Sequence, residues 1–570
     1  MVLKGKGAAC GAAVGRIYIY NEKFNIPVEN FVCAGEEQSH LDRYLSVKNE
    51  ALKELEEIRL SMQKADADKA EIFGAHQEIV EDIIINEEIP ARILNQRWTG
   101  DWAIYQVYET ILGVLRNTPD PLISERAVDF DDVRALLLKL WYGQKADGLG
   151  NLKKPCIIAA RELKPSDTAS LDRDNVLAII TEAGGVTSHT AIIAKSYGIP
   201  AVLGIDGLMG FVKQGQLAAV DADKGIVTLD PEKSVTEELL EKSSSFLRDR
   251  QAAETFRDSK AGTACGVEIE IGLNISNFNE DEKAAESYTD SAGLFRTEYL
   301  FLGHNKLPSE EEQFTFYSKV LKCFGEKPVV LRTLDIGGDK QITGIKHKPE
   351  ENPFLGNRGI RFCFSNPEIF KTQIRAALRA ALYGNLWLML PMVGSLEDIR
   401  RAKEHIAAAC EELKKEGLPF GNIKTGIMIE VPSIALVADH AAREADFASI
   451  GSNDLCQYLC AADRMNSAVE PYYHHYHPGM FRIIKETITA FTEAGKPISI
   501  CGELGSDPLA VPVLIGLGMR KFSMAAPSVA AVKRAIASVT IEKAQELAEK
   551  VLQIPSAGEI EQFLSQRSGL

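Results

Sequence analysis

The sequence predicts a multidomain α/β protein with an inserted helical bundle, a helical linker and a C-terminal (β/α)8 barrel. Three observations predict this. Strand-like runs flank a long segment with helical periodicity, a polar helical stretch follows them, and eight short apolar runs alternate with helix-length spacers in the remainder.

Composition is that of a soluble globular protein with several cores. The chain has 570 residues, of which 45% are hydrophobic and 25% charged. This length suits two to four domains. The net charge of −16 argues against a nucleic-acid partner, because such proteins usually carry a basic face. An anionic substrate would therefore need a local cluster of Arg or Lys.

The cysteines and the apolar runs indicate a cytoplasmic protein. The ten cysteines include no CxxC pair, so we expect free thiols in a reducing compartment. The N-terminus has no long apolar stretch typical of a signal peptide. No run of about 18 apolar residues is present, so we expect no membrane insertion.

The N-terminal half combines an α/β domain with an inserted bundle. Residues 1–20 end in the strand-like run RIYIY, and strand-like runs return after Pro155, so 1–20 and 145–230 form one predicted domain. Residues 21–144 interrupt it with apolar side chains at three- and four-residue spacing, which predicts helices. The polar, helix-patterned residues 231–259 are a predicted linker.

Residues 260–570 form the predicted barrel. Eight apolar runs recur there: EIEIGLNIS, AGLFRTE, VVLRTLD, LWLMLPMV, TGIMIEVPS, FASIGSNDL, ISICGEL and KFSMAAPS. Eight strands alternating with helices favour a (β/α)8 barrel. A doubly wound open sheet is the alternative that this pattern leaves open.

Polar side chains follow five of the eight runs, where barrel enzymes place their chemistry. The five segments are Arg296-Thr297-Glu298, Arg332-Thr333-Leu334-Asp335, Glu430-Val431-Pro432, Ser452-Asn453-Asp454 and Cys501-Gly502-Glu503. One such segment alone is as easily a structural ion pair. Five together predict an active site.

The arginines and acids suit a phosphorylated anion and a divalent cation. Arg296 and Arg332 fall on neighbouring strands of the predicted barrel. Neighbouring strands lie roughly 5 Å apart, so the two guanidiniums could bind one phosphate. Arg464 and Arg358 supply further candidate positive groups. The carboxylates of Glu430 and Asp454 lie on adjacent strands and suit Mg²⁺. Ion pairs between these acids and the same arginines are the alternative.

Two further groups need separate interpretation. Cys501, at a strand end among charged neighbours, is a candidate for proton exchange with a substrate carbon. His474, His475 and His477 are candidate ligands of a transition metal, but consecutive histidines in a Tyr- and Pro-rich loop are more often surface residues, and we favour that interpretation.

A histidine stands at a predicted helix start in TEAGGVTSHTAIIAKSYGIPAV. Gly184 and Gly185 give a turn, the helix begins near His189, and Gly198 and Pro200 end it. The free N–H groups and dipole of a helix N-terminus would stabilise a phosphoryl group on His189. A plain helix-capping histidine is the equally weighted alternative.

The segment GGVTSHTAIIAKSYGIPAV resembles the phosphohistidine motif of enzyme I of the sugar phosphotransferase system, and of pyruvate phosphate dikinase and phosphoenolpyruvate synthase. The segments GLFRTEYLF, RTLDIGGDK, NPFLGNRGIR, IMIEVPS, GSNDLCQY and CGELGSDP resemble the phosphoenolpyruvate-binding TIM barrel of the same families. Dikinase and synthase need a nucleotide-binding domain, and no GxxxxGK[ST] loop occurs here. The resemblance is therefore to the enzyme I family.

The resemblance implies a function and a set of site residues. His189 would carry phosphate from phosphoenolpyruvate to the phosphocarrier protein HPr, the first step of the phosphotransferase system. Substrate-binding residues would be Arg296, Arg332, Asn453 and Arg464; Mg²⁺ ligands would be Glu430 and Asp454. Cys501 would be the proton donor, and Thr168 would hydrogen-bond the active histidine.

The resemblance also implies roles for the domains. Residues 1–20 and 145–230 would be the swivelling phosphohistidine domain, and 21–144 the carrier-binding subdomain. Residues 260–570 would bind substrate and form a homodimer.

The sequence departs from the family pattern at several positions. Lys195 replaces a usual Arg, Ala9-Cys10 replaces Ser-Pro, and Ser452 replaces Thr. The segment RAVDFDDVRALLL also differs, in the region implied to bind the carrier. A dikinase- or synthase-like enzyme and a regulatory phosphotransfer protein are the alternative functions.

Overall fold

The computed structural model describes residues 1–20, 26–33, 35–63, 67–116, 121–143, 149, 152, 154–163, 167, 171–172, 175–184, 189–301, 306–337, 350–464, 466 and 468–567. The chain divides into two compact units, Met1–Asp249 and Arg250–Leu570, which are described separately. Among the described residues, no helix has the length and apolar character needed to cross a membrane.

The first unit contains an eight-stranded mixed sheet in the order β1-β8-β7-β3-β4-β5-β6-β2. Its strands are β1 (Val2–Lys4), β2 (Lys6–Ala9), β3 (Ala12–Tyr20), β4 (Cys156–Ala160), β5 (Val176–Thr181), β6 (Ala201–Leu203), β7 (Leu217–Asp221) and β8 (Ile226–Leu229). β3 pairs in parallel with β4, and Ile17 faces Ile157 across the ladder. Strands on either side of the inserted helices therefore join one sheet.

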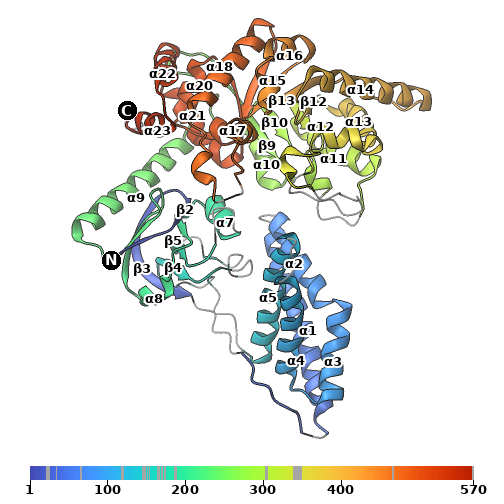
Figure 1. The fold of residues 1–570 in the computed structure, drawn as a ribbon, viewed down its shortest axis with the longest axis vertical. Coiled ribbons are helices and arrows are strands. Elements are labelled where there is room, and N and C mark those ends of the chain that lie inside the picture. Colours follow the sequence, from blue (N-terminus) through green and yellow to red (C-terminus); the bar gives the residue numbers. More distant parts are fainter. Residues whose placement is uncertain are drawn as a thin grey trace. The chain divides into compact units, whose positions relative to one another are not determined.

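Five helices lie between β3 and β4 in the sequence and pack on one another (Figure 1). They are α1 (Glu37–Gln63), α2 (Ala67–Val80), α3 (Ile83–Gln96), α4 (Gly100–Arg116) and α5 (Pro121–Trp141). Tyr44, Leu55, Ile89, Tyr108 and Leu137 belong to their shared core. Many of the apolar side chains at helical spacing thus face inward, although Ile83, Ile84 and Val114 are exposed.

Two more helices of this unit matter for function. α7 (His189–Tyr197) begins at the histidine singled out above and is followed by Gly198, which has a φ of 65°. α9 (Lys233–Glu254) is the expected helical segment. Leu239 of α9 packs against Ala12 and Ala219, so the start of this helix rests on the sheet.

The second unit is built on a closed barrel of eight parallel strands. They are β9 (Glu270–Ile275), β10 (Ser291–Phe295), β11 (Pro328–Arg332), β12 (Asn385–Leu390), β13 (Lys424–Ile429), β14 (Ala448–Gly451), β15 (Ile498–Cys501) and β16 (Lys521–Met524). Each predicted apolar run supplies one strand. The barrel prediction is confirmed, and the open-sheet alternative is wrong because β16 closes the sheet on β9.

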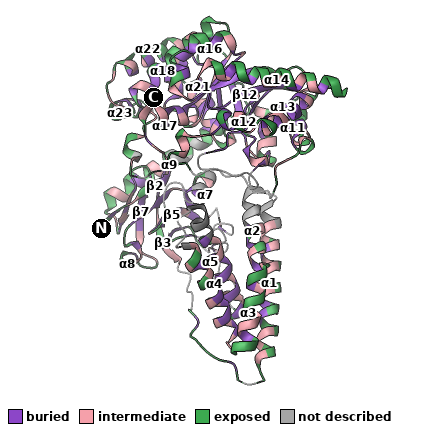
Figure 2. Ribbon diagram, turned by 45° about the vertical axis from the view of Figure 1, so that its right-hand side comes forward, coloured by how far each residue is buried: buried purple, intermediate pink, exposed green. Residues whose placement is uncertain are grey.

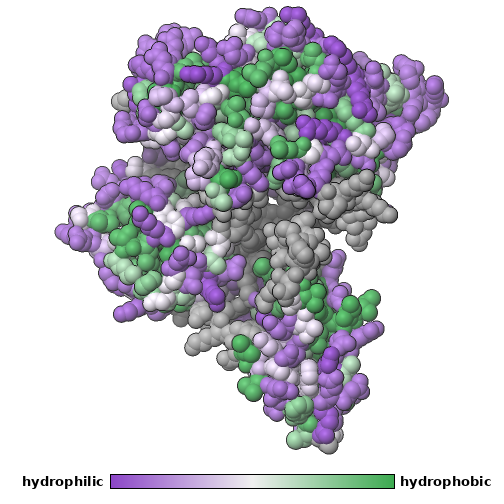
Figure 3. All heavy atoms as spheres, in the orientation of Figure 1, coloured by the Kyte–Doolittle hydropathy of each residue, from purple (hydrophilic) through white to green (hydrophobic). Residues whose placement is uncertain are grey.

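Helices surround the barrel, and Figure 2 shows buried strands inside and exposed outer helix faces. The helices of six residues or more are α10 (Glu280–Ala285), α11 (Glu310–Phe324), α12 (Ile360–Ser365), α13 (Pro367–Ala380), α14 (Leu396–Glu416), α16 (Ala438–Glu444), α17 (Ser452–Cys460), α18 (Pro478–Glu493), α20 (Val511–Gly516), α21 (Val529–Ala537), α22 (Ile541–Gln553) and α23 (Ala557–Ser565). Hydrophilic residues dominate the described face of α14 (Figure 3).

Side chains pack closely inside the barrel. A Cβ on Gly293 would lie 2.4 Å from Ser523 Oγ, so the interior leaves no room for a side chain there. Further along, Leu294, Met389, Met428 and Cys501 belong to one buried cluster. This filled interior holds the carboxyl ends of the strands in fixed positions around the mouth.

Candidate active site

Five polar strand ends meet at the carboxyl mouth of the barrel. Arg296 follows β10, Arg332 ends β11, Glu430 follows β13, Asn453 and Asp454 open α17 directly after β14, and Cys501 ends β15. Parallel strands present these ends on one side. The structure therefore brings the predicted barrel residues into one region, although their roles stay predictions.

Arg332 is buried and paired with carboxylates. Its Nη2 donates to Glu298 Oε1 at 2.8 Å, and its Nη1 lies 3.1 Å from Asp335 Oδ2. Burial disfavours the charge, but these two carboxylates raise the pKa of Arg332 above its ordinary value. Arg332 thus stays charged. Its Nη1 and Nη2 form the ion pairs that the sequence left open as an alternative.

Arg358 joins two strand ends. It donates to both carboxylate oxygens of Asp335, at 3.3 and 3.0 Å, and to Asp454 Oδ1 at 3.2 Å. Its Nη1 also reaches Tyr458 OH at 3.2 Å, and that hydroxyl donates to Phe354 O. This guanidinium is committed to protein groups, so it holds the acids in place.

Arg296 and Arg464 are the more accessible cations. Arg296 is exposed, and the surrounding protein and the charge of Arg332 lower its pKa. Arg464 is half-buried and lies 3.8 Å from Asp454. These two guanidiniums are the cations at the mouth that an anionic ligand could reach.

Glu430 has one engaged oxygen and one free oxygen. Its Oε1 accepts the backbone N–H of Met392 at 2.6 Å, while Oε2 has no hydrogen-bond partner among the described residues. Burial, then the charges of Asp454 and Asp335, raise the pKa of Glu430 to about 8. A cation beside this carboxylate would favour its ionised form.

The acids fit Mg²⁺ as a donor set. Glu430 Oε2 is free, and Asp454 lies near enough to influence its charge. Among the described residues, no cluster of three or more His, Cys, Asp and Glu side chains is arranged as a metal site. Two carboxylates with the remaining ligands from substrate and water are typical of Mg²⁺ sites.

Asn453 and Cys501 complete the mouth. Asn453 Oδ1 accepts the backbone N–H of Glu503 at 2.8 Å, which leaves its Nδ2 to donate elsewhere. The Cys501 thiol donates to Ile450 O at 3.4 Å and accepts from Ser449 Oγ at 3.7 Å. Burial raises the pKa of Cys501, so the thiol keeps its proton at neutral pH.

Unsatisfied polar atoms gather at this mouth. Four buried atoms lack a hydrogen-bond partner within the described part of the chain: Arg332 Nε, Thr333 Oγ1, Glu430 Oε2 and Gln457 Nε2. Buried polar groups are normally paired, and each exception needs an explanation. An anionic ligand could accept a hydrogen bond from Arg332 Nε, and a cation bound with it could contact Glu430 Oε2.

Three further residues contribute to the mouth and were not among the predicted site residues. Met392 acts through its backbone, Tyr458 binds Arg358, and Gln373 on α13 hydrogen-bonds two strand ends. Tyr458 falls within the quoted segment GSNDLCQY, so its place one helical turn after Asp454 was a usable signal. Gln373 lies far from any strand end in the sequence, and no pattern marks it.

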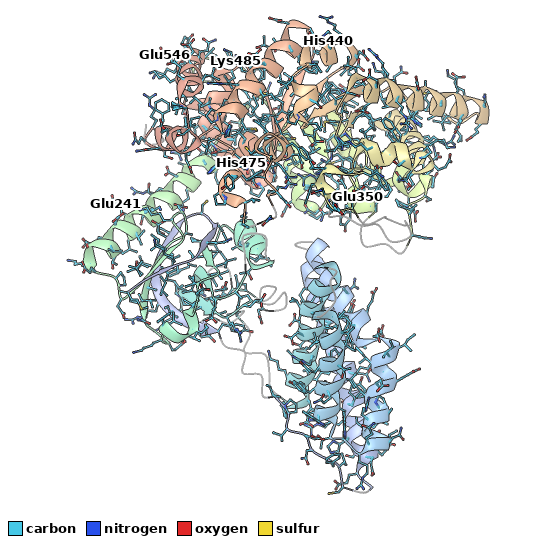
Figure 4. All side chains as sticks on the ribbon, viewed as in Figure 1. Glu241, Glu350, His440, His475, Lys485 and Glu546 are labelled. Atoms are coloured by element: carbon cyan, nitrogen blue, oxygen red, sulfur yellow. The ribbon has the colours of Figure 1, made fainter. Side chains whose placement is uncertain are left out.

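Two of the three loop histidines have hydrogen-bond partners in the described part of the chain. His475 Nε2 lies 2.9 Å from Glu503 Oε2, in the segment before α18 (Figure 4). His477 caps α18, its Nδ1 accepting the Gly479 N–H at 3.1 Å. These two rings therefore have separate structural partners, and the metal alternative stays untested.

In the first unit, the start of α7 is described at His189, but the His189 side chain lies outside the described residues, as does Thr168. Thr190 Oγ1 donates to Leu163 O at 3.3 Å, and Ala191 and Ala194 are buried against the sheet. These contacts fix the helix start that carries the histidine. Lys195 is exposed.

Three family models match successive parts of this chain. Residues 4–126 match the N-terminal domain of PEP-utilising enzymes, 152–225 their mobile domain and 250–541 their PEP-binding domain. The NMR solution structure of Enzyme I (nEIt) is 32% identical, with a TM-score of 0.38, over 43% of this chain and 99% of that chain.

Two full-length relatives share both the sequence and the extent of the chain. The phosphoenolpyruvate-protein phosphotransferase of Staphylococcus carnosus is 37% identical over 98% of this chain and 97% of its own length. That of Bacillus subtilis is 35% identical over 99% of each. With such identity across both units, the chain belongs to the phosphoenolpyruvate-protein phosphotransferase family.

Proposed function

We propose that this protein transfers the phosphoryl group of phosphoenolpyruvate to a histidine of the phosphocarrier protein HPr, through a phosphohistidine on His189, and releases pyruvate. The observation that carries the proposal is the barrel mouth. There, Arg296 is exposed, and Arg332 Nε and Glu430 Oε2 are buried without a hydrogen-bond partner in the described part of the chain. Family membership supports the donor and the reaction class.

The barrel mouth would bind phosphoenolpyruvate by its two anionic groups. Arg296 and Arg464 are accessible cations, and Arg332 has an unpaired Nε. A guanidinium can donate two parallel hydrogen bonds to two oxygens of a phosphate or a carboxylate. Asn453 Nδ2 would add a neutral donor. These four residues would orient the substrate and offset charge on the phosphoryl group as it transfers.

Glu430 and Asp454 would hold Mg²⁺ beside the substrate. The free Oε2 of Glu430 supports this assignment. The ion would neutralise negative charge on the phosphate oxygens. Arg358 would keep Asp454 aimed at that position, because it bonds Asp454 and Asp335 at once.

The chemistry needs one nucleophile and one proton donor. A neutral imidazole nitrogen of His189 would attack phosphorus, forming the N–P bond as the P–O bond to the enol breaks. The enolate of pyruvate would take a proton at its methylene carbon from the Cys501 thiol, and solvent would return that proton to the thiolate. The raised pKa of Cys501 supports this role, because the thiol would be protonated before the enolate forms.

We assign the remaining roles by region. Residues 1–20 and 145–230 would carry the phosphohistidine, 21–144 would bind the carrier, 231–259 would link the units, and 260–570 would bind substrate and form a homodimer. The five packed helices within 21–144 offer the carrier a surface separate from the sheet.

Labelling with ³²P-phosphoenolpyruvate and Mg²⁺ tests the proposal. The protein should acquire acid-labile, base-stable phosphate, and adding HPr should discharge it. His189→Ala should abolish labelling while phosphoenolpyruvate still binds, and His440→Ala, at an exposed site of the barrel unit, should label normally. Persistent labelling of the His189→Ala protein would refute the assignment. An undischarged phosphoprotein would refute HPr as the acceptor.

A further inference from the structure

Gln373 is a buried amide on α13 that bonds two neighbouring strand ends of the barrel. Its side chain is 1% exposed. Its Oε1 accepts the backbone N–H of Leu334 at 2.9 Å, two residues beyond Arg332. Its Nε2 donates to Thr297 Oγ1 at 3.0 Å, next to Arg296. One side chain therefore contacts both segments that carry the substrate-facing arginines.

The directions of these bonds are fixed. A backbone N–H only donates, so the atom facing Leu334 is the Gln373 oxygen, and Nε2 must face Thr297. The Thr297 hydroxyl donates a hydrogen bond to the backbone carbonyl of Arg332 at 2.9 Å. The ends of β10 and β11 are thus joined twice. Thr297 bonds directly to Arg332, and Gln373 bonds to both Thr297 and Leu334.

A second chain of bonds holds Gln373 itself. Nε2 also donates to Tyr317 OH at 3.2 Å, and that hydroxyl donates to Gln313 Oε1 at 3.0 Å. Gln313 Nε2 donates to Pro308 O at 3.1 Å. Tyr317 and Gln313 are buried on α11. The amide is therefore fixed by two helices and has little freedom to turn.

We infer that Gln373 is a positioning residue, which sets the separation of the strand ends carrying Arg296 and Arg332 and so determines how tightly the phosphate group of the substrate is bound. The inference rests on the proposed function, because it takes phosphoenolpyruvate as the ligand of this mouth. Gln373 acts through Thr297 and Leu334, since it is buried behind them.

The physical need for such a residue is electrostatic. Burial, and after it the charge of Arg332, lowers the pKa of Arg296, while Glu298 and Asp335 counteract part of this effect. The two like-charged side chains therefore need neighbouring strand ends whose separation is fixed by other contacts. Hydrogen bonds to the backbone at Leu334 and to the hydroxyl at Thr297 provide such contacts, and buried bonds of this kind are costly to break.

The test measures binding without turnover. In the His189→Ala protein, which cannot be phosphorylated at His189, the affinity for phosphoenolpyruvate with Mg²⁺ is measured by calorimetry for Gln373→Leu, Gln373→Glu and Thr297→Val. Thr487→Val is the control: Thr487 is buried, and its hydroxyl donates within α18 to Ile483 O at 2.7 Å. Thermal unfolding of each protein shows whether it is folded.

We expect Gln373→Leu to weaken phosphoenolpyruvate binding by about tenfold or more, as a misplaced binding group does, with Thr487→Val unchanged. Gln373→Glu, which keeps the acceptor for Leu334, should recover part of the loss. In proteins with His189 intact, KM should rise more than kcat falls. The double variant Thr297→Val/Gln373→Leu should bind no more weakly than Gln373→Leu alone.

Wild-type affinity in folded Gln373→Leu would overturn the inference, as would losses that simply multiply in the double variant. If Gln373→Leu does not fold, wild-type affinity in both Gln373→Glu and Thr297→Val overturns it instead. Failure of the proposed function is a separate result, since it would appear as absent labelling of the unmodified protein or absent binding of phosphoenolpyruvate.

Discussion

The backbone N–H of Met392 donates to Oε1 of Glu430 across 2.6 Å, and Met392 adopts a φ of 56°. A non-glycine residue in this left-handed region carries a cost of order 1–3 kcal/mol, which the surrounding structure must offset. The bond occupies one carboxylate oxygen and leaves Oε2 free. A backbone N–H thus orients this carboxylate.

Gly451→Ala should impair the use of Mg²⁺. A Cβ there would lie 3.0 Å from Glu430 Oε2 and 3.1 Å from Met428 Sδ, so it would crowd the free oxygen. We expect the Mg²⁺ concentration for half-maximal phosphorylation to rise about tenfold, and stability to fall by about 1–3 kcal/mol through overpacking.

Gly558→Ala is the matched control, since a Cβ there meets nothing within 4 Å. Its Mg²⁺ dependence should equal that of the unmodified protein. If Gly451→Ala also leaves the Mg²⁺ dependence unchanged, Glu430 Oε2 is not a ligand.

Cys501→Ala should separate substrate binding from turnover. Loss of the proton donor should lower kcat for pyruvate formation by about 100-fold or more, with the affinity for phosphoenolpyruvate retained. Steady-state kinetics with HPr and equilibrium binding measure the two effects. A variant with unchanged kcat would remove Cys501 from the mechanism.

The same thiol should resist alkylation. Burial raises the pKa of Cys501, so its protonated form persists as pH rises through the ordinary thiol pKa near 8.5. Cys265 is exposed, and hydrogen bonds from Thr263 and the Ile541 N–H lower its pKa. Iodoacetamide at pH 7 should therefore modify Cys265 well before Cys501, as peptide mass spectrometry can show. Faster labelling of Cys501 would contradict this.

The sequence predicted those parts of the site that follow directly from strand ends. In a parallel barrel, the residue after each apolar run must lie at the mouth, so Arg296, Glu430 and Cys501 could be located from the pattern alone. The parallel pairing of β13 with β14 then follows from chain order, which made Glu430 and Asp454 neighbours.

Other features needed three dimensions. The fourth run ends in Pro391-Met392-Val393, with no polar side chain, so its backbone role was invisible. Gln373 reaches the mouth from a helix 39 residues from its partner Leu334. Nor does spacing reveal which arginine pairs with which acid, because that depends on side-chain directions at adjacent strands.

His477→Ala should destabilise the barrel unit without affecting any metal. The ring Nδ1 accepts the Gly479 N–H at the start of α18, and loss of a cap costs about 1 kcal/mol. His477→Asn, which can also cap, should retain most of the stability in thermal unfolding. Zinc titration should give no binding that depends on His474, His475 or His477. Binding lost in these variants would revive the metal interpretation.

Arg358→Lys should destabilise the barrel far more than a matched surface change. Arg358 bonds Asp335 through two nitrogens and Asp454 through a third contact, and a lysine ammonium cannot reproduce that planar arrangement. Leaving buried carboxylates underpaired should cost about 2–4 kcal/mol. Arg400→Lys alters a solvent-exposed pair with Glu444 and should leave stability almost unchanged. Denaturant unfolding measures both. Equal losses would show that the Arg358 network adds no more than a surface pair, and that Asp454 is held at the mouth by other contacts.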